Sequence, residues 1–281
     1  MTRDIGRKII RTFVHNRAAL FGLAISIVVI AVCLLAPYLP LDDPLEHSMA
    51  HRFRAPSAEH FLGTDDFGRD VLSRVIWGGR ISLLVGVLSV VLAMSLGAVI
   101  GLVAGYTGGV LDSFIMRIVD VLMCFPTMIL GILFMAALGS GLNSLIVAIG
   151  VAITPRFVRL CRGSVLSVKE NDFVEAARGM GLSNTRIMFR HILPNVVGDM
   201  VVMGSLWIGA IIVAEAGLSF LGLGVPPPTP SWGRMVRDGM DFLSHADWVS
   251  IYSGGAILVT VIGFNLFADG LRDIMDPKLR R

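Results

Sequence analysis

The sequence predicts an all-α polytopic membrane protein with six transmembrane helices, for three reasons. Apolar residues make up 54% of the chain and charged residues only 16%, a balance that does not suit a water-soluble globule. The apolar residues form six continuous runs that reach or approach the roughly 20 residues a helix needs to cross about 30 Å of hydrocarbon. Their continuity excludes the alternating pattern of a transmembrane barrel, so helices must satisfy the backbone hydrogen bonds.

The six predicted spans follow one another with few charges inside them. They cover residues 18–39, 81–105, 118–138, 142–158, 196–221 and 251–268. The first run is longer than the core of a typical signal peptide, so we expect it to be retained as a membrane helix. Apolar residues at helical spacing between 71 and 76 predict a short interfacial helix that leads into the second span.

The positive charges predict the orientation, because cytoplasmic loops retain Lys and Arg. With both termini in the cytoplasm, most of the 24 Lys and Arg residues fall on the cytoplasmic side. The predicted parts are a cytoplasmic tail (1–17), a first helix with an extracytoplasmic loop (18–80), a core (81–272) that contains a cytoplasmic loop (160–195), and a cytoplasmic tail (273–281). The expected surroundings of the chain are a lipid bilayer. Nucleic acid is not an expected partner, because the Lys and Arg residues are divided among helix ends rather than gathered on one face.

Motifs for catalysis or nucleotide binding are absent from the sequence. None of the three lysines follows a glycine, which excludes a phosphate-binding P-loop, and neither a nucleophile elbow nor a zinc-protease helix occurs. The three cysteines have no paired spacing and the six histidines are scattered. A hard-cation site at Asp65, Asp66 and Asp70 is a weaker interpretation than turn and capping roles, because the spacing is not that of a calcium loop. We therefore expect no enzyme activity and no cofactor or metal bound by this chain.

The longest cytoplasmic loop has the pattern of two short helices joined by a glycine bend. Asp172 is expected to cap the first helix, with Glu175 reaching back to it as in a capping box. Ala176, Ala177 and Arg178 continue this helix, and Gly179 and Gly181 end it.

The second short helix is expected to begin after Ser183 or Asn184 and to stop at Leu193-Pro194 before the fifth span. Such a bent pair of helices can enter a groove on a partner protein. The alternative is an amphipathic loop held on the bilayer surface by its basic residues.

Small residues and buried acids mark further candidate positions. Gly97, Gly101 and Gly105 recur every four residues of the second span and predict a face where another helix approaches closely.

Ionisable residues inside a membrane are costly and usually face protein or water. Asp120 is expected to pair with Arg117 one turn earlier, and Asp199 lies near a membrane boundary. Glu215, which is deeper in the fifth span, is the best candidate for lining a pathway or meeting a partner subunit. Asp120 and Asp199 are kept as weaker candidates for the same role.

Several strings resemble one known family. Glu175-Ala176-Ala177, Gly181 and Leu193-Pro194, at this spacing and between the fourth and fifth spans, resemble the coupling motif of ABC importer permeases. Four further strings resemble the second-named, or C-type, permease of dipeptide, oligopeptide and nickel importers. They are Leu62-Gly63-Thr64-Asp65, Gly68-Arg69-Asp70, Glu215-Ala216-Gly217-Leu218-Ser219-Phe220 and Ser231-Trp232-Gly233. His191 departs from the broader family, which often has Ile there, but the surrounding string looks like the peptide branch.

The resemblance implies a type I importer fold, in which a five-helix core follows one extra helix, in a prokaryotic plasma membrane. It implies a non-catalytic subunit that pairs with a homologous second permease, two ABC ATPase subunits that bind ATP and Mg, and an extracytoplasmic solute-binding protein. Residues 175–178, Gly181, Leu193 and Pro194 would contact the ATPase. Di- and oligopeptides are the expected solutes, with nickel, glutathione or another small solute as alternatives. An ion-driven carrier that works alone is the second hypothesis, but no inverted repeat with matched broken helices supports it.

Overall fold

The computed structural model describes residues 16–275, so most of the two predicted cytoplasmic tails lies outside the described residues. The helices are α2 (Arg17–Leu34), α3 (Val71–Thr107), α4 (Gly109–Met123), α5 (Thr127–Leu138), α6 (Leu142–Val168), α7 (Asp172–Gly179), α8 (Asn184–Arg186), α9 (Leu193–Phe220), α10 (Trp232–Met240) and α11 (Asp247–Met275). Short 3₁₀ turns occur at Ala36–Tyr38 and Met49–His51, and a π-helical stretch at Ile187–Ile192. The described part of the chain contains no strand beyond one isolated bridge between Thr64 and Asp70.

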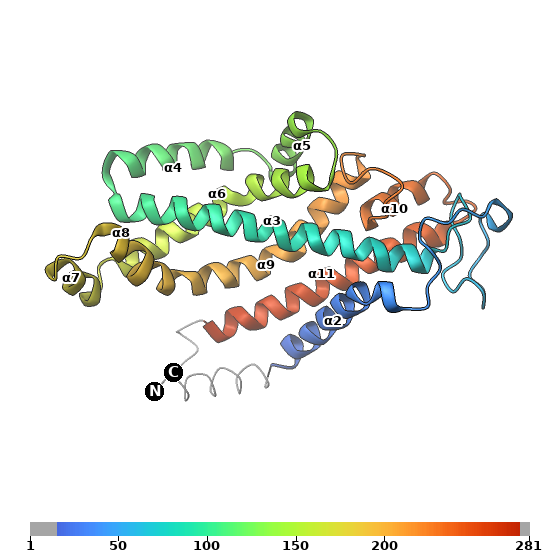
Figure 1. The fold of residues 1–281 in the computed structure, drawn as a ribbon, viewed down its shortest axis with the longest axis horizontal. Coiled ribbons are helices and arrows are strands. Elements are labelled where there is room, and N and C mark those ends of the chain that lie inside the picture. The colour runs from blue at the N-terminus through green and yellow to red at the C-terminus, as the bar shows by residue number, and fades with distance from the viewer. Residues whose placement is uncertain (1–15, 276–281) are drawn as a thin grey trace.

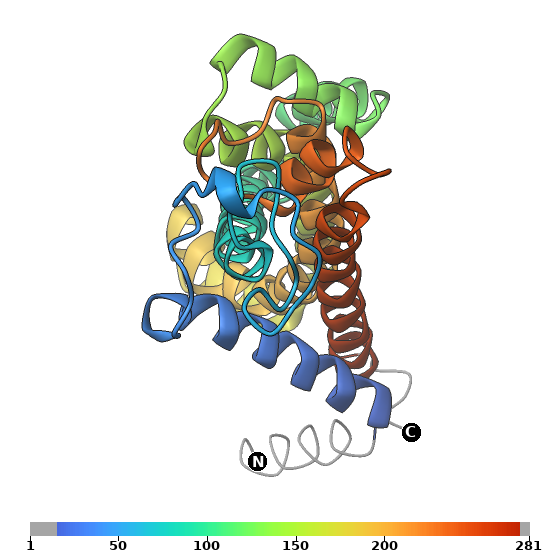
Figure 2. The same ribbon diagram turned by 90° about the vertical axis from the view of Figure 1, so that its right-hand side faces the viewer.

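The long helices run along one axis of an elongated molecule. Figure 1 shows α3, α6, α9 and α11 lying roughly along the long axis, with α7 and α8 at one end and α10 with the loop of residues 40–70 at the other. Helix α2 packs along α11, and α4 and α5 lie on the opposite side of the molecule, as both views show (Figures 1 and 2). The two ends of the bundle therefore carry different structures.

The predicted class, an all-α polytopic membrane protein, is confirmed, but one predicted span is broken. Five helical segments are long and apolar enough to cross a membrane, and α4 and α5 form a sixth span only as a pair bent by 96°. The predicted continuous span at 118–138 is therefore wrong. Pro126 stands at the break, directly before α5, because a proline lacks the N–H that would continue the first helix and restricts the residue before it.

The separate interfacial helix predicted before the second span is also wrong. Helix α3 runs without interruption from Val71 to Thr107, a length of about 55 Å at 1.5 Å per residue. The Asp70 carboxylate caps its first turn by accepting a hydrogen bond from the Ser73 N–H at 2.8 Å. Helix α3 is therefore much longer than the roughly 30 Å thickness of the hydrocarbon core.

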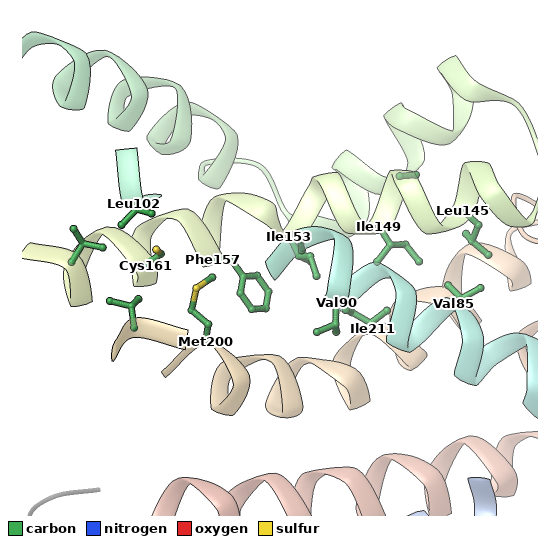
Figure 3. Packing of buried hydrophobic residues seen from close by; sticks show 14 of the residues in the cluster. Val85, Val90, Leu102, Leu145, Ile149, Ile153, Phe157, Cys161, Met200 and Ile211 are labelled. Atoms are coloured by element: carbon green, nitrogen blue, oxygen red, sulfur yellow. The ribbon is translucent and has the colours of Figure 1, made fainter. Parts of the chain in front are cut away.

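The core is formed mainly where α3, α6 and α9 meet. Figure 3 shows Ile153 and Phe157 of α6 between Val90 of α3 and Met200 and Ile211 of α9. All five side chains are almost fully buried. Three helices thus share one continuous apolar core.

The three glycines of the second span lie against α6. A Cβ placed on Gly101 would lie 2.6 Å from the Val158 carbonyl oxygen, and one placed on Gly105 would lie 2.9 Å from Val165 Cγ1. Gly97 faces Phe157 one turn earlier. The absence of side chains on this face lets the two helix backbones approach closely, as the glycine spacing predicts.

We predict that Gly101→Ala destabilises the protein, because its methyl group has no space against α6. The matched control is Gly163→Ala, since Gly163 lies in α6 with open space around it. Overpacking at such a site costs about 1–3 kcal/mol. Thermal unfolding in detergent should show a lower midpoint for Gly101→Ala and an unchanged or raised midpoint for Gly163→Ala. Equal midpoints for both variants would contradict the close contact.

Candidate functional site

The segment between α6 and α9, residues 169–192, projects from one end of the molecule and is called the projecting segment. Helix α6 extends ten residues past its predicted end at 158, to Val168, and is about 40 Å long. Figure 1 shows α7 as the outermost element at this end. The projecting segment is thus carried by helices that continue beyond the apolar core.

The start of α7 differs from its prediction. Asn171, not Asp172, is the N-cap residue, and its side chain makes no capping hydrogen bond. Asp172 and Glu175 lie instead in the first turn, where their negative charges interact favourably with the positive end of the helix dipole. Within the described residues, the Glu175 side chain forms no ion pair or hydrogen bond, and it is exposed. It is therefore available to a group outside the chain.

The end of α7 is a Schellman motif, in which the residue after the cap has a left-handed conformation. Gly181 has a φ of +73°. Its N–H donates to the Arg178 carbonyl at 2.9 Å, and the Leu182 N–H donates to the Ala177 carbonyl at 3.2 Å. Gly181 is thus the residue that turns the chain, whereas Gly179 is the last residue of the helix.

One face of α7 is packed and the other is bare. Val174 and Ala177 are buried in the same apolar cluster as Ile187 and Ile192. The outer face carries exposed acidic, small and apolar side chains, namely Asp172, Phe173, Glu175, Ala176 and Met180. Met180 is 71% exposed. The helix is therefore seated on the protein and presents a mixed surface outward.

The end of α3 holds the projecting segment through three contacts. The Tyr106 hydroxyl donates to Asn184 Oδ1 at 2.8 Å, and the Arg178 guanidinium lies 5.4 Å from the centre of the Tyr106 ring. The Lys169 ammonium donates to the Gly105 carbonyl at 3.1 Å. Both α7 and α8 are thereby tied to the same turn of α3.

The predicted stop at Leu193-Pro194 is wrong, because the helical path continues into α9. Residues Ile187–Ile192 are π-helical, and the Leu193 N–H donates to the Met188 carbonyl five residues earlier. The wider turn accommodates Pro194, whose ring would crowd the preceding carbonyls of an ordinary α-helix. Asn195 Nδ2 donates to the His191 carbonyl at 2.7 Å. Leu193 and Pro194 thus form a continuous joint between the projecting segment and α9.

Asp120 and Asp199 contact α6. Asp120 pairs with Arg159 of α6, so the predicted pair with Arg117 is wrong. Asp199 accepts a hydrogen bond of 2.6 Å from the Ser164 hydroxyl. Both carboxylates are exposed. They lie on helices that pack around α6, so local spacing along one helix did not reveal their partners.

A third acidic residue, Asp112, ties the start of α4 to α6. The Arg162 guanidinium donates to both of its carboxylate oxygens, at 2.5 and 2.6 Å. This fork-to-carboxylate geometry is the strongest form of such a pair.

Glu215 lies inside the chain rather than on its surface. Its side chain is fully buried and accepts hydrogen bonds from the Ser82 hydroxyl at 2.8 Å and the Ser219 hydroxyl at 2.7 Å. It therefore joins α3 to α9. In this arrangement its carboxylate is enclosed between α3 and α9 and does not reach the surface of the described residues.

Comparison with known proteins identifies two matching family models. The model of the family described as "binding-protein-dependent transport system inner membrane component" matches residues 97–281. The model described as "N-terminal TM domain of oligopeptide transport permease C" matches residues 5–56. The first match includes the whole projecting segment.

Similar proteins cover nearly the full length of this chain. It is 40% identical to the dipeptide transport system permease protein DppC of Alkalihalophilus pseudofirmus, over 98% of this chain and 90% of that protein. Identity is 43% with the glutathione transport system permease protein GsiD of Pectobacterium atrosepticum, over 99% and 91%. The oligopeptide transport system permease protein OppC of Bacillus subtilis is 38% identical, over 96% and 88%.

We predict that Gly181→Ala loosens the projecting segment, because a left-handed conformation costs an L-residue about 1–2 kcal/mol. Apart from atoms of Gly181 and its two chain neighbours, no atom lies within 4 Å of the position of the added methyl group, so the cost is conformational rather than steric. Gly179→Ala is the matched control, since Gly179 is helical and also has open space around it. Amide hydrogen exchange should rise across residues 172–187 in Gly181→Ala only. Equal exchange in both variants would show that the turn does not hold the segment.

Proposed function

The chain belongs to the family of binding-protein-dependent transport system inner membrane components, and from this membership we propose that it is the ATPase-coupled permease of an importer for short peptides. Its partners are a homologous second permease, two ATPase subunits that bind ATP and Mg, and an extracytoplasmic solute-binding protein. The complex lies in a prokaryotic plasma membrane, with the projecting segment on the cytoplasmic side. This chain forms part of the solute pathway and carries out no hydrolysis itself.

The observation that supports this proposal is the construction of the projecting segment. Its outer surface, from Asp172 to Met180, is unpaired within the described residues apart from the Arg178 ring contact with Tyr106. Its inner surface is fixed to three long helices through the core, Tyr106 and the π-helical joint. A small helix that is exposed on one face and rigidly held on the other suits a docking element that transmits motion.

Transmission follows from these attachments. When two ATPases close on ATP, docked α7 helices would be displaced together with them. The displacement would pass to α9 through the continuous helical joint at Leu193, and to α3 through Tyr106 and Asn184. Because α3, α6 and α9 share one core, they would move as a body and change access to the pathway.

Short peptides are the solute class that the relatives favour. Two of the relatives are named for dipeptide and oligopeptide transport and one for glutathione, which is itself a small peptide. The lone-carrier hypothesis has no comparable support, since the buried carboxylate of Glu215 is occupied by serine hydroxyls.

We predict that a photo-activatable crosslinker attached to Ala176→Cys captures an ATPase subunit in cells that express the whole transporter. Cys124 is replaced by Ser because it is exposed, whereas Cys33 and Cys161 are buried. Ser57→Cys, exposed at the opposite end of the molecule, is the control and should capture no ATPase. Mass spectrometry of the crosslinked band identifies the partner. Failure of Ala176→Cys to capture any ATPase would refute the docking role.

We also predict that Tyr106→Leu lowers ATP-driven peptide uptake several-fold in proteoliposomes, because it removes the contacts that join α3 to α7 and α8. ATP hydrolysis by the assembled complex should persist, since the ATPases themselves are unchanged. Thr107→Val is the control, because the Thr107 hydroxyl donates to the Val103 carbonyl of its own helix and, within the described residues, makes no hydrogen bond to α7 or α8. Uptake by Tyr106→Leu equal to that of wild type would show that these contacts do not transmit motion.

A further inference from the structure

The loop at the end opposite the projecting segment brings two histidines together. His60 Nε2 lies 3.3 Å from His51 Nδ1, and the two rings are edge-on, with centroids 5.5 Å apart. The ligand atoms of His51, His60 and Glu59 all lie within 4.8 Å of one another. Histidines that are scattered in the sequence, and from which no metal site was expected, thus converge in the fold.

We propose that His51 Nδ1, His60 Nε2 and a Glu59 carboxylate oxygen bind one Zn²⁺, with water as the fourth ligand. Zinc in proteins takes imidazole nitrogens at about 2.0–2.1 Å in tetrahedral geometry, which places two such nitrogens about 3.3 Å apart. The separation of the two histidine nitrogens already matches this value. Two nitrogens and one carboxylate select a borderline ion over Ca²⁺ or Mg²⁺, which prefer oxygen ligands.

The second nitrogen of His60 is held in the way typical of metal-binding histidines. His60 Nδ1 lies 3.1 Å from Asp70 Oδ1, and both side chains are buried. A carboxylate on this nitrogen favours a proton there and leaves the lone pair of Nε2 free for a metal. Asp42 lies farther off, at 3.9 Å from the same nitrogen. The ring of His60 is therefore oriented by carboxylates that are not themselves ligands.

The backbone around the two histidines is fixed by short-range hydrogen bonds. The Thr64 hydroxyl donates to the His51 carbonyl and accepts from the Arg54 N–H at 2.8 Å. The Ser57 hydroxyl accepts from the His60 N–H at 3.1 Å. The backbone that carries both imidazoles is thus held in place by hydrogen bonds, so the two rings need to rearrange little to bind a metal.

Glu59 is the ligand that must move. It is exposed and pairs with Arg54 at 3.3 Å, and the Arg54 side chain is itself 46% exposed. Exposed ion pairs of this kind contribute little to stability, so the carboxylate can exchange Arg54 for the metal. The Zn²⁺ would be connected to the first turn of α3 through His60, because Asp70 contacts His60 with one oxygen and caps Ser73 with the other.

Zinc binding to the purified full-length chain, with any affinity tag removed, tests this proposal. Wild type in detergent should retain one Zn²⁺ per chain, and His51→Gln should weaken the affinity by about tenfold or more, as loss of a ligand or its support does. His47→Gln is the matched control, since His47 stacks on Phe67 outside the cluster, and should bind as wild type does. Equal affinity in wild type and His51→Gln, or no zinc bound by wild type, would overturn the proposal and leave a plain histidine pair.

Trypsin cleavage gives a second readout that does not depend on metal analysis. Arg52 and Arg54 are exposed and lie in the sequence between His51 and Glu59. Zn²⁺ should slow cleavage after these residues in wild type and in His47→Gln but not in His51→Gln. Cleavage rates that Zn²⁺ leaves unchanged in all three proteins would count against the site. This outcome is independent of ATPase docking, which concerns the other end of the molecule.

Discussion

The close contact between α3 and α6 is the constraint on which the rest of the structure depends. Lipid offers helices no hydrophobic reason to associate, so packing distance and polar contacts must supply the attraction. Gly101 and Gly105 let the two backbones approach so closely that a Cβ on either glycine would lie 2.6 Å or 3.1 Å, respectively, from a main-chain carbonyl oxygen of α6. That approach positions Phe157 against Met200 of α9 and brings the last turn of α3 to the base of the projecting segment. Without it, Tyr106 would have no fixed relation to Asn184.

Hydropathy and glycine spacing were enough to predict the class, five of the spans and a close-packing face on α3, because each depends on the residues within one segment. That α6 is the helix packed on this face was not predicted. The break at Pro126 was not predictable in the same way. Prolines are tolerated inside membrane helices when neighbours satisfy the freed backbone groups, so an apolar run that contains proline reads as one span. Pro194 shows the opposite case. A proline usually ends a helix, but here a π-helical turn before Pro194 lets the helix continue. No residue pattern in the sequence predicts the hydrogen bonds of that turn.

Partners that are distant along the chain mark the limit of prediction at the candidate site. Gly181 was recognisable because a glycine after a short helix is a local signal. The bond between Tyr106 and Asn184 spans 78 positions, and Asp120 pairs with Arg159 rather than with an arginine on its own helix. Glu215 was recognisable as an unusual residue in a membrane span, but Ser82 of α3, which donates a hydrogen bond to its carboxylate, lies 133 positions away. The local sequence identifies which polar side chains need a hydrogen-bond or ion-pair partner, whereas the identity of that partner depends on the tertiary fold.

An unbroken α3 has a consequence for how the two ends of the molecule communicate. Its first turn is capped by Asp70, which also contacts His60, and its last turn holds Tyr106 against the projecting segment. An uninterrupted helix of about 55 Å transmits a displacement of one end as a tilt or shift of the other. Had a separate interfacial helix preceded the span, a joint near residue 80 would absorb that displacement. Continuity from Val71 to Thr107 therefore links the loop of residues 40–70 mechanically to α7 through one helix, with side-chain contacts at its two ends.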